Sequence, residues 1–182
     1  GLTPIRARRR PDPGTAQYIS PGMLTFDRHS SIAEIPRIEW DSLADRLPTP
    51  LLEWEWLRAM EESGSITPRH GWIPTHLTCR RQGRLVGAIP LYVRHESMGE
   101  FVFDFALADV AQQIGVPYYP KLVGMSPATP STAFRFLIDP SEDGEEIAQA
   151  MLEETFRIAR ESGCMAVQFN YVEPEFRGFL RD

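Results

Sequence analysis

The chain has 182 residues, of which 42% are hydrophobic, 10% aromatic and 24% charged. This is the composition of an ordinary globular protein, and it excludes collagen, coiled coil and wholesale disorder. The net charge is −6, but residues 1–23 carry four arginines and one aspartate, so this segment has +3 and the remainder −9. An acidic body argues against nucleic-acid binding as the main function. We expect residues 1–23 to be a basic, disordered tail and residues 24–182 to form a single domain.

Neither a membrane span nor a secretory signal is predicted. No stretch approaches the roughly 20 apolar residues that a transmembrane helix requires, and the beginning of the chain lacks the apolar run of a secretory signal. Two cysteines, Cys79 and Cys164, lie in apolar surroundings. Two lone thiols in a chain of this size are typical of reduced core residues. The expected location is therefore the cytoplasm.

The first part of the chain predicts a strand around residues 24–29, followed by two amphipathic helices. The second helix is expected to begin near Thr49-Pro50 and to end at Ser63-Gly64. Trp54 lies off the apolar face of that helix, so we expect it to be half exposed and to cover another domain or a second chain. The expected core residues are Trp40, Leu43, Ala44 and Leu47 of the first helix and Leu52, Trp56, Ala59 and Met60 of the second.

The middle of the chain predicts a β-hairpin and then an irregular region. Residues 75–81 and 85–94 are β-prone and are joined by Gln82-Gly83, where glycine allows the positive φ of a tight turn. Pro90 has no N–H to donate, so the second strand should bend or lie at an edge there. Residues 101–105, if a strand, would place three phenylalanines on one face and Asp104 on the other. A short helix is predicted for residues 106–115, and residues 116–130 contain too many prolines for regular structure.

Residues 141–173 contain no proline and predict a long helix followed by a strand. Asp143 is a suitable N-cap with Glu146 three residues later, and Gly163 ends the apolar stripe of the helix. In residues 165–172 both alternating sets of side chains are largely apolar, which predicts a central strand covered on both faces. An antiparallel hairpin followed by a helix-connected strand predicts an α+β fold with a mixed α/β sheet.

The common catalytic signatures are absent, and the four histidines are scattered, so we predict no metal site. Asp104 lies among aromatic residues. It is either a base with a raised pKa or a group that binds an amide or a substrate amine. The alternative is that Asp104 caps the following turn and that the aromatic residues are core. Tyr118, Tyr119 and Lys121 offer ring faces, hydroxyls and a positive charge to a polar ligand, although such a run is also a common way to leave a loop.

Four segments resemble, in this order, the Fem-like family of bacterial peptidoglycan biosynthesis and recognition proteins, which belongs to the GNAT acyltransferase superfamily. They are PLLEWEWLRAMEESGS, GRLVGAIPLY, GEFVFDFALAD and YYPKLVGMSPATP. The resemblance spans roughly residues 31–175. It implies a GNAT-like fold with a central mixed β-sheet flanked by helices, and an acyltransferase that moves an acyl or aminoacyl group onto an amine.

The resemblance also implies partners and co-substrates. Fem-like proteins resemble two tandem GNAT-like domains, so the chain looks like the N-terminal half, and a missing second domain or a homodimer is expected to cover its apolar surface. No cofactor is expected to be tightly bound. The donor would be an acyl-CoA or an aminoacyl ester such as aminoacyl-tRNA, and the acceptor a cell-wall precursor or another small molecule. The Gln/Arg-x-x-Gly-x-Gly/Ala loop that cradles the CoA pyrophosphate in ordinary GNAT enzymes is absent, and residues 123–127 hold the corresponding place.

The candidate site follows from motif membership and chemistry. Asp104 is the expected catalytic residue. The expected substrate-binding residues are Glu100, Tyr118, Tyr119, Lys121 and Thr129. The competing hypothesis is a non-catalytic binding or scaffold module for a cell-wall precursor or a protein partner, which keeps the fold and has lost donor binding.

Overall fold

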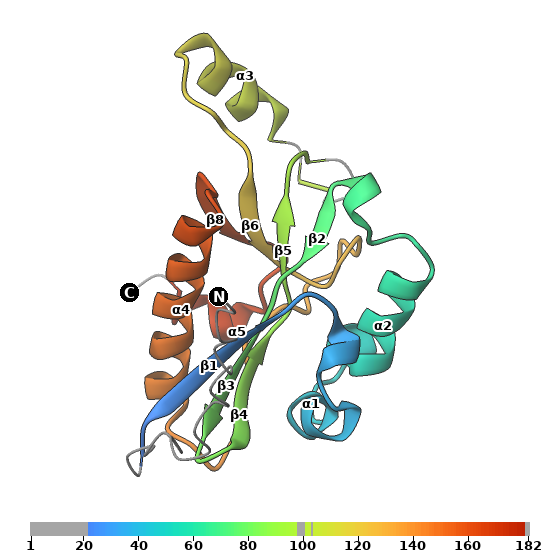
Figure 1. Cartoon of the computed structure of the whole chain (residues 1–182), viewed down its shortest axis with the longest axis vertical. Coiled ribbons are helices and arrows are strands. Elements are labelled where there is room, and N and C mark those ends of the chain that lie inside the picture. Colours follow the sequence, from blue (N-terminus) through green and yellow to red (C-terminus); the bar gives the residue numbers. More distant parts are fainter. Residues whose placement is uncertain (1–21, 98–100, 103, 181–182) are drawn as a thin grey trace, which may run out of the picture.

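The computed structural model describes residues 22–97, 101–102 and 104–180, and most of the predicted tail lies outside these residues. Its strands form two four-stranded sheets (Figure 1). The first sheet is antiparallel, with the order β1 (Leu24–His29), β3 (His76–Arg81), β4 (Arg84–Ile89) and β7 (Leu137–Ile138). The second has the order β2 (Trp72–Pro74), β5 (Leu91–Arg94), β6 (Lys121–Gly124) and β8 (Ala166–Phe169). Only β6 and β8 run parallel, so the second sheet is mixed.

Two long segments of the chain pass from one sheet into the other. Thr75 separates β2 from β3, and Pro90 separates β4 from β5. Because proline cannot donate to a ladder, the hydrogen bonding is interrupted at Pro90, as predicted. The mixed α/β fold is confirmed, with its strands divided between two sheets where one central sheet was expected.

The predicted hairpin is formed by β3 and β4. Gln82 and Gly83 have φ values of 53° and 80°. Positive φ at both turn residues matches the right-handed twist of the flanking strands, which is why a glycine is needed in this short connection. A bulge between Cys79 and Arg80 shifts the register within the hairpin. Both cysteines are free thiols, and Cys79 is buried.

Helices cover both sides of the first sheet (Figure 1). α1 (Arg37–Ala44) packs against β4 and β7, and α4 (Gly144–Glu161) packs against β3, β4, β7 and β8. α4 is built as predicted: Asp143 accepts hydrogen bonds from the first amides, and Gly163 follows the helix with φ 66°. Its buried stripe is formed by Ile147, Ala148, Met151, Thr155, Ile158 and Ala159.

The first two helices confirm one prediction and correct another. Trp40, Leu43 and Ala44 of α1 are buried as expected. In α2 (Trp54–Glu62) the buried residue is Leu57, whereas Ala59 is exposed. The reason is that Thr49 caps a separate 3-10 turn, Pro50–Leu52, and extended backbone at Glu53 divides this turn from α2. The helix therefore begins later than predicted, and the predicted Trp56 and Met60 are half-buried and pack against the hydrophobic clusters.

Three further predictions about the second half are wrong. β8 is the edge strand of its sheet and is half-buried, because only one of its faces lies against the main core. The described residues among 101–105 form no strand: Phe101 has φ 57°, and α3 (Phe105–Gln113) begins directly after Asp104. Regular structure does occur among the prolines, since β6 lies between Pro120 and Pro127.

α3 projects from one end of the molecule, away from the other helices (Figure 1). The chain ends in a short helix, α5 (Pro174–Arg177), at the side of the first sheet where α4 lies. Within residues 22–97 and 101–180, apart from residue 103, no helix is long and apolar enough to cross a membrane.

Candidate functional site

A group of polar side chains gathers on one face of the second sheet, at the start of β6. Successive side chains of a strand point to opposite faces. Leu122 of β6 and Val167 of β8 lie in the main hydrophobic core, so Lys121 and Gln168 lie on the opposite face. Segments before β6 bring further polar groups to this face. We call the group the Asp104 cluster: Ser97, Asp104, Tyr118, Tyr119, Lys121 and Gln168.

Lys121 is the centre of the cluster. Its Nζ donates hydrogen bonds to Asp104 Oδ2 at 2.8 Å and to Ser97 Oγ at 2.8 Å. The rings of Tyr118 and Tyr119 lie 5.7 and 5.5 Å from the same nitrogen, within cation–π range. The Lys121 side chain is fully buried. The ammonium group is therefore held in place from several sides by polar and aromatic partners.

Two tyrosine hydroxyls complete the cluster. Tyr118 Oη donates to Asp104 Oδ2 at 2.6 Å, and Gln168 Nε2 donates to Tyr118 Oη at 3.4 Å. Tyr119 Oη lies 2.6 Å from Ser97 Oγ, where either hydroxyl can be the donor. Of the predicted site residues, Asp104, Tyr118, Tyr119 and Lys121 thus lie together.

The charge states of the cluster follow from these contacts. Burial raises the pKa of the Asp104 carboxyl, but the hydrogen bonds from Lys121 and Tyr118 outweigh this effect and bring it to about 2. Burial, and then the hydrogen bond to Asp104, raise the pKa of Tyr118 to about 12. At neutral pH, Asp104 is ionised and Tyr118 keeps its proton. The raised pKa expected for Asp104 is not found, because the hydrogen bonds from Lys121 and Tyr118 stabilise the carboxylate.

The capping alternative does not describe the Asp104 side chain either. Asp104 occupies the N-cap position of α3, but its side chain makes no capping hydrogen bond. Its Oδ2 is used by Lys121 and Tyr118 instead. The carboxylate therefore ties the start of α3 to β6.

Two buried acceptor atoms in the cluster, Asp104 Oδ1 and Gln168 Oε1, have no hydrogen-bond partner among the residues that the structure describes. Because most buried polar atoms in proteins are satisfied, such acceptors favour a ligand or water that brings N–H or O–H donors. The adjoining surface holds a pocket of about 470 Å³ lined by Tyr118, Tyr119 and residues of α3 and the turn after it.

Of the two other predicted site residues, one lies away from this cluster and one is not described. Thr129 Oγ1 donates to Pro127 O at 2.9 Å within its own loop, and Glu100 lies outside the described residues. Ser97 and Gln168 were not predicted. Gln168 had a signal, because it is a polar residue on an otherwise apolar strand, whereas Ser97 had none beyond its position after β5.

A second pocket, of about 890 Å³, lies elsewhere, between β7, the start of α4 and the segment around α5. Its lining is acidic and aromatic, with Asp139, Glu142, Glu145, Phe176 and Phe179 among its residues. Arg84 pairs with both Asp139 and Glu142. The pocket therefore combines an apolar wall with carboxylates that are partly neutralised.

The start of α4 does not fit a pyrophosphate. Helix N-termini bind phosphates through free amide groups and a favourable dipole. The segment leading into α4 is residues 139–143, whereas residues 123–127, the predicted place for this loop, belong to β6 and the loop after it. At α4, Asp143 already accepts the amides of Glu145 and Glu146, and all three side chains are acidic.

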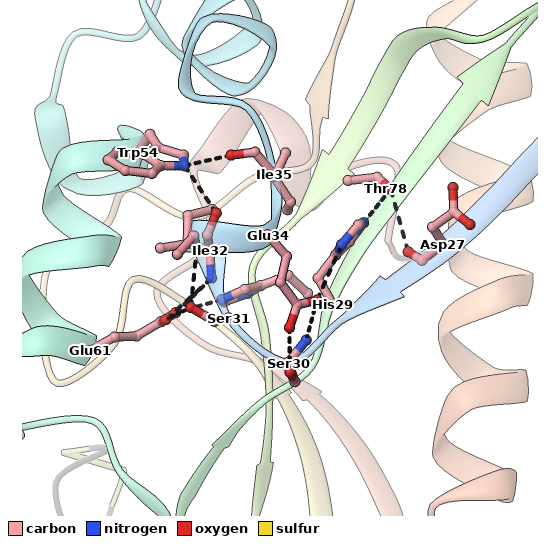
Figure 2. A network of polar contacts seen from close by, with 12 residues as sticks. Asp27, His29, Ser30, Ser31, Ile32, Glu34, Ile35, Trp54, Glu61 and Thr78 are labelled. Carbon is pink, nitrogen blue, oxygen red and sulfur yellow. Dashed lines mark hydrogen bonds and ion pairs between the residues drawn. The ribbon is translucent and has the colours of Figure 1, made fainter.

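A second polar network joins β1, α2 and β3 (Figure 2). Glu61 of α2 accepts hydrogen bonds from Ser31 Oγ at 2.7 Å and from the Ile32 amide at 3.2 Å, and it lies 2.9 Å from Nε2 of the fully buried His76. Trp54 Nε1 donates to the carbonyls of Ile32 and Ile35. Trp54 is half-buried, as predicted, and its indole N–H is paired within its own chain.

This network could not be predicted, because its members are far apart in the chain. Its hydrogen bonds join α2 to the segment after β1 and to β3, so we assign it a structural role. Among the described residues, no three His, Cys, Asp or Glu side chains are grouped so that they could hold a metal ion.

The chain is similar to known proteins in sequence and in fold. A family model, FemAB-like, described as peptidoglycan biosynthesis/recognition, matches residues 31–181. No curated protein sequence gives a significant match. The solved structure of the aminoglycoside N-acetyltransferase AAC(6')-Iy in complex with CoA is similar, with a TM-score of 0.50 and 13% identity over 85% of this chain and 80% of that chain.

Two further solved structures are similar. One is a ribosomal-protein-alanine N-acetyltransferase from Brucella melitensis, with a TM-score of 0.49 and 12% identity over 81% of this chain and 79% of that one. The other is a GCN5-related N-acetyltransferase from Ralstonia eutropha, with a TM-score of 0.48 and 13% identity over 87% and 90%. At such identities the likeness concerns the fold, and the similarity to the aminoglycoside enzyme confirms the predicted GNAT-like architecture.

Proposed function

Because this chain belongs to the FemAB-like family of peptidoglycan biosynthesis and recognition proteins, we propose that it is an N-acyltransferase domain. It transfers an acyl or aminoacyl group to an amine, and a cell-wall precursor carries that amine. The family match supports the substrate class. The fold shared with a solved N-acetyltransferase supports the type of reaction.

The Asp104 cluster is the observation that carries the proposal. It lies at the start of β6, beside the parallel strand β8. The ladder between these two strands ends at the pair Gly124 and Phe169. Acyl transfer to an amine requires that the amine is oriented beside the donor carbonyl and that the developing oxyanion is stabilised. The unpaired acceptors Asp104 Oδ1 and Gln168 Oε1 suit the N–H groups of an amine.

Within this proposal the residues have separate roles. Tyr118 keeps its proton at neutral pH and donates a hydrogen bond to Asp104 Oδ2, so it holds the carboxylate in place beside the acceptor atoms. Asp104 is a positioning residue, since a carboxyl with a pKa of about 2 is a poor base. It orients Tyr118 and Lys121 through one oxygen. Tyr119 extends the site toward the neighbouring pocket.

The donor is an acyl-CoA or an aminoacyl ester. The aminoglycoside enzyme of similar fold was solved with CoA, which makes acyl-CoA the first donor to test. The acidic start of α4 is unfavourable for a pyrophosphate at that position. The same observation favours a second candidate function, a binding module that recognises the cell-wall precursor and has lost donor binding.

Ligand titration separates the two functions. Thermal-shift and calorimetric titrations with acetyl-CoA, a longer acyl-CoA and a nucleotide-linked muramyl peptide measure which compound stabilises the folded chain. Binding of a thioester together with acylation of the muramyl peptide, followed by mass spectrometry, supports the enzyme. Binding of the muramyl peptide alone, without transfer from any donor, supports the binding module. No binding of any of the three contradicts both.

A tyrosine variant tests the site. Tyr118→Phe removes a hydroxyl from the cluster and should lower kcat by about 10²-fold if this group stabilises the transition state. Tyr171→Phe is the matched control, because its hydroxyl bonds the Phe101 carbonyl outside the cluster. Equal turnover of Tyr118→Phe and the wild type would remove Tyr118 from the reaction.

A further inference from the structure

α3 and the turn after it, residues 105–116, form an arm whose apolar side chains lie on its outer surface. No residue of α3 is buried. Leu107, Val110 and Ile114 are 61%, 52% and 69% exposed. Their spacing of three and four residues places them in one stripe along the arm. This is the apolar stripe that an amphipathic helix normally turns toward its own core.

The other side of the same arm borders a pocket. Ala108, Asp109 and Gln112 line this pocket together with Tyr118 and Tyr119, and Asp109 and Gln112 are themselves exposed. The arm therefore leaves its apolar stripe exposed without burying its polar side. A helix of nine residues is marginally stable in water without packing partners, so an arm with an exposed apolar stripe calls for a partner.

We propose that the stripe of one copy packs antiparallel against the stripe of a second copy of this chain, around a two-fold axis next to Val110. Leu107 and Ile114 are nearly equidistant from Val110 along the helix. In an antiparallel pair, Leu107 of one copy then meets Ile114 of the other, and the reverse. Such self-complementarity is what a two-fold interface requires.

The charge of the arm favours a second copy of this chain over a lipid surface as the partner of the stripe. Residues 105–116 contain no lysine or arginine, and their single carboxylate, Asp109, lies on the inner side at the pocket. Anionic membrane surfaces attract helices that carry Lys and Arg, and the arm has none. Two arms can meet without opposing charges in the contact, whereas the acidic body of the chain would repel another copy elsewhere.

The stripe is small, since it consists of Leu107, Val110 and Ile114 with the adjoining Ala106, Ala111 and Val116. A contact of this kind is typical of weak, transient association, which buries less than about 1,200 Å² in total. Pairing also bears on the candidate site, since the arm begins after Asp104 and leads directly to Tyr118 and Tyr119.

Sedimentation velocity between about 5 and 500 µM protein tests the proposal. The wild type should shift from monomer to dimer across this range. The double variant Leu107→Gln/Ile114→Gln keeps good helix formers and should remain monomeric throughout. Ile38→Gln is the matched control, because Ile38 lies on α1 and is 82% exposed; it should dimerise like the wild type.

Cross-linking locates the axis. In a Cys164→Ser background, Val110→Cys should form a disulfide-linked dimer under mild oxidation, and Ile38→Cys should not. A wild type that stays monomeric at 500 µM overturns the proposal and assigns the stripe to a different protein or to another segment. A double variant that dimerises as well as the wild type overturns the location of the interface. Circular dichroism confirms that each variant is folded.

Discussion

At the scale of single residues, the central feature is a buried ion pair. Lys121 is fully buried and Asp104 is 5% exposed, and their side chains lie 2.8 Å apart. Removing one partner from such a pair leaves an uncompensated buried charge, which is costly, although the pair as a whole adds little to stability. The cluster therefore fixes the geometry of the face of β6 more than it stabilises the fold.

Asp104→Asn tests this pair. The change leaves Lys121 without its counter-charge and should lower the free energy of unfolding by about 3 kcal/mol, measured by urea denaturation at neutral pH. Asp109→Asn, an exposed aspartate of the same arm, is the control and should change stability by less than about 0.5 kcal/mol. Equal stabilities of the two variants would show that the buried pair does not form.

The same pair predicts a pH dependence. The pKa of Asp104 falls from 3.8 to about 2 on folding, so the unfolded chain binds this proton more readily. The contribution of Asp104 is fully present above about pH 4 and is lost as the pH falls toward 2. The stability difference between wild type and Asp104→Asn should shrink in that window. A difference that is constant from pH 7 to pH 3 would contradict the lowered pKa.

Glu61 is a second carboxylate whose charged form is stabilised by hydrogen bonds. Burial raises its pKa, but the hydrogen bond from His76 and further donors outweigh this effect, so its pKa is lowered from 4.5. Glu61→Gln should cost about 1–3 kcal/mol, because Ser31, Ile32 and His76 lose a charged acceptor. The neighbouring Glu62→Gln changes only an exposed pair with Arg58 and should be nearly neutral. Thermal unfolding of both variants provides the comparison.

At the scale of elements, close packing of β6 against aromatic rings requires a glycine. A Cβ at Gly124 would lie 2.6 Å from Phe134 Cζ and 2.7 Å from Phe169 Cδ1. These rings are stacked on each other and packed in the core. Gly124→Ala should therefore destabilise the chain by about 1–3 kcal/mol.

A second glycine supplies the control for this prediction. A Cβ at Gly144, the first residue of α4, meets nothing within 4 Å. Gly144→Ala should be neutral or slightly stabilising, since alanine is the better helix former. The melting temperatures of Gly124→Ala and Gly144→Ala measure this difference in stability. A tolerated Gly124→Ala would mean that the two rings can move apart.

The elements that the sequence predicts well are those with local signals. Asp143 and Gly163 mark the ends of α4, and Gln82-Gly83 marks the hairpin turn, because capping and positive φ depend on neighbouring residues. The position of β8 at an edge could not be predicted. It depends on which strand lies beside β6, and the apolar pattern of residues 165–172 contains no information on that.

The candidate site likewise has a part that the sequence predicts and a part that depends on the fold. Asp104, Tyr118, Tyr119 and Lys121 are close in the sequence, so their chemistry could be considered together. Gln168 meets Tyr118 across a separation of 50 residues, which only the folding of β8 beside β6 brings about. The lowered pKa of Asp104 was also out of reach, because the sequence does not show that Lys121 contacts it.

At the scale of the whole molecule, charge and apolar surface are separated. The body is acidic, while the arm carries an uncharged stripe. Association through the arm therefore has to overcome repulsion between two acidic bodies, which acts over roughly 10 Å at 0.1 M salt. An interface built on ion pairs would respond to salt in the opposite direction.

This separation predicts how salt affects the dimer. Raising NaCl from about 0.05 to 0.5 M shortens the Debye length and weakens the repulsion, but leaves the apolar contact intact. The dimer fraction of the wild type at a fixed protein concentration should therefore increase, as measured by sedimentation velocity, while Leu107→Gln/Ile114→Gln stays monomeric at both salt concentrations. A dimer that dissociates in 0.5 M NaCl would place the contact on charged residues of the body, away from the stripe.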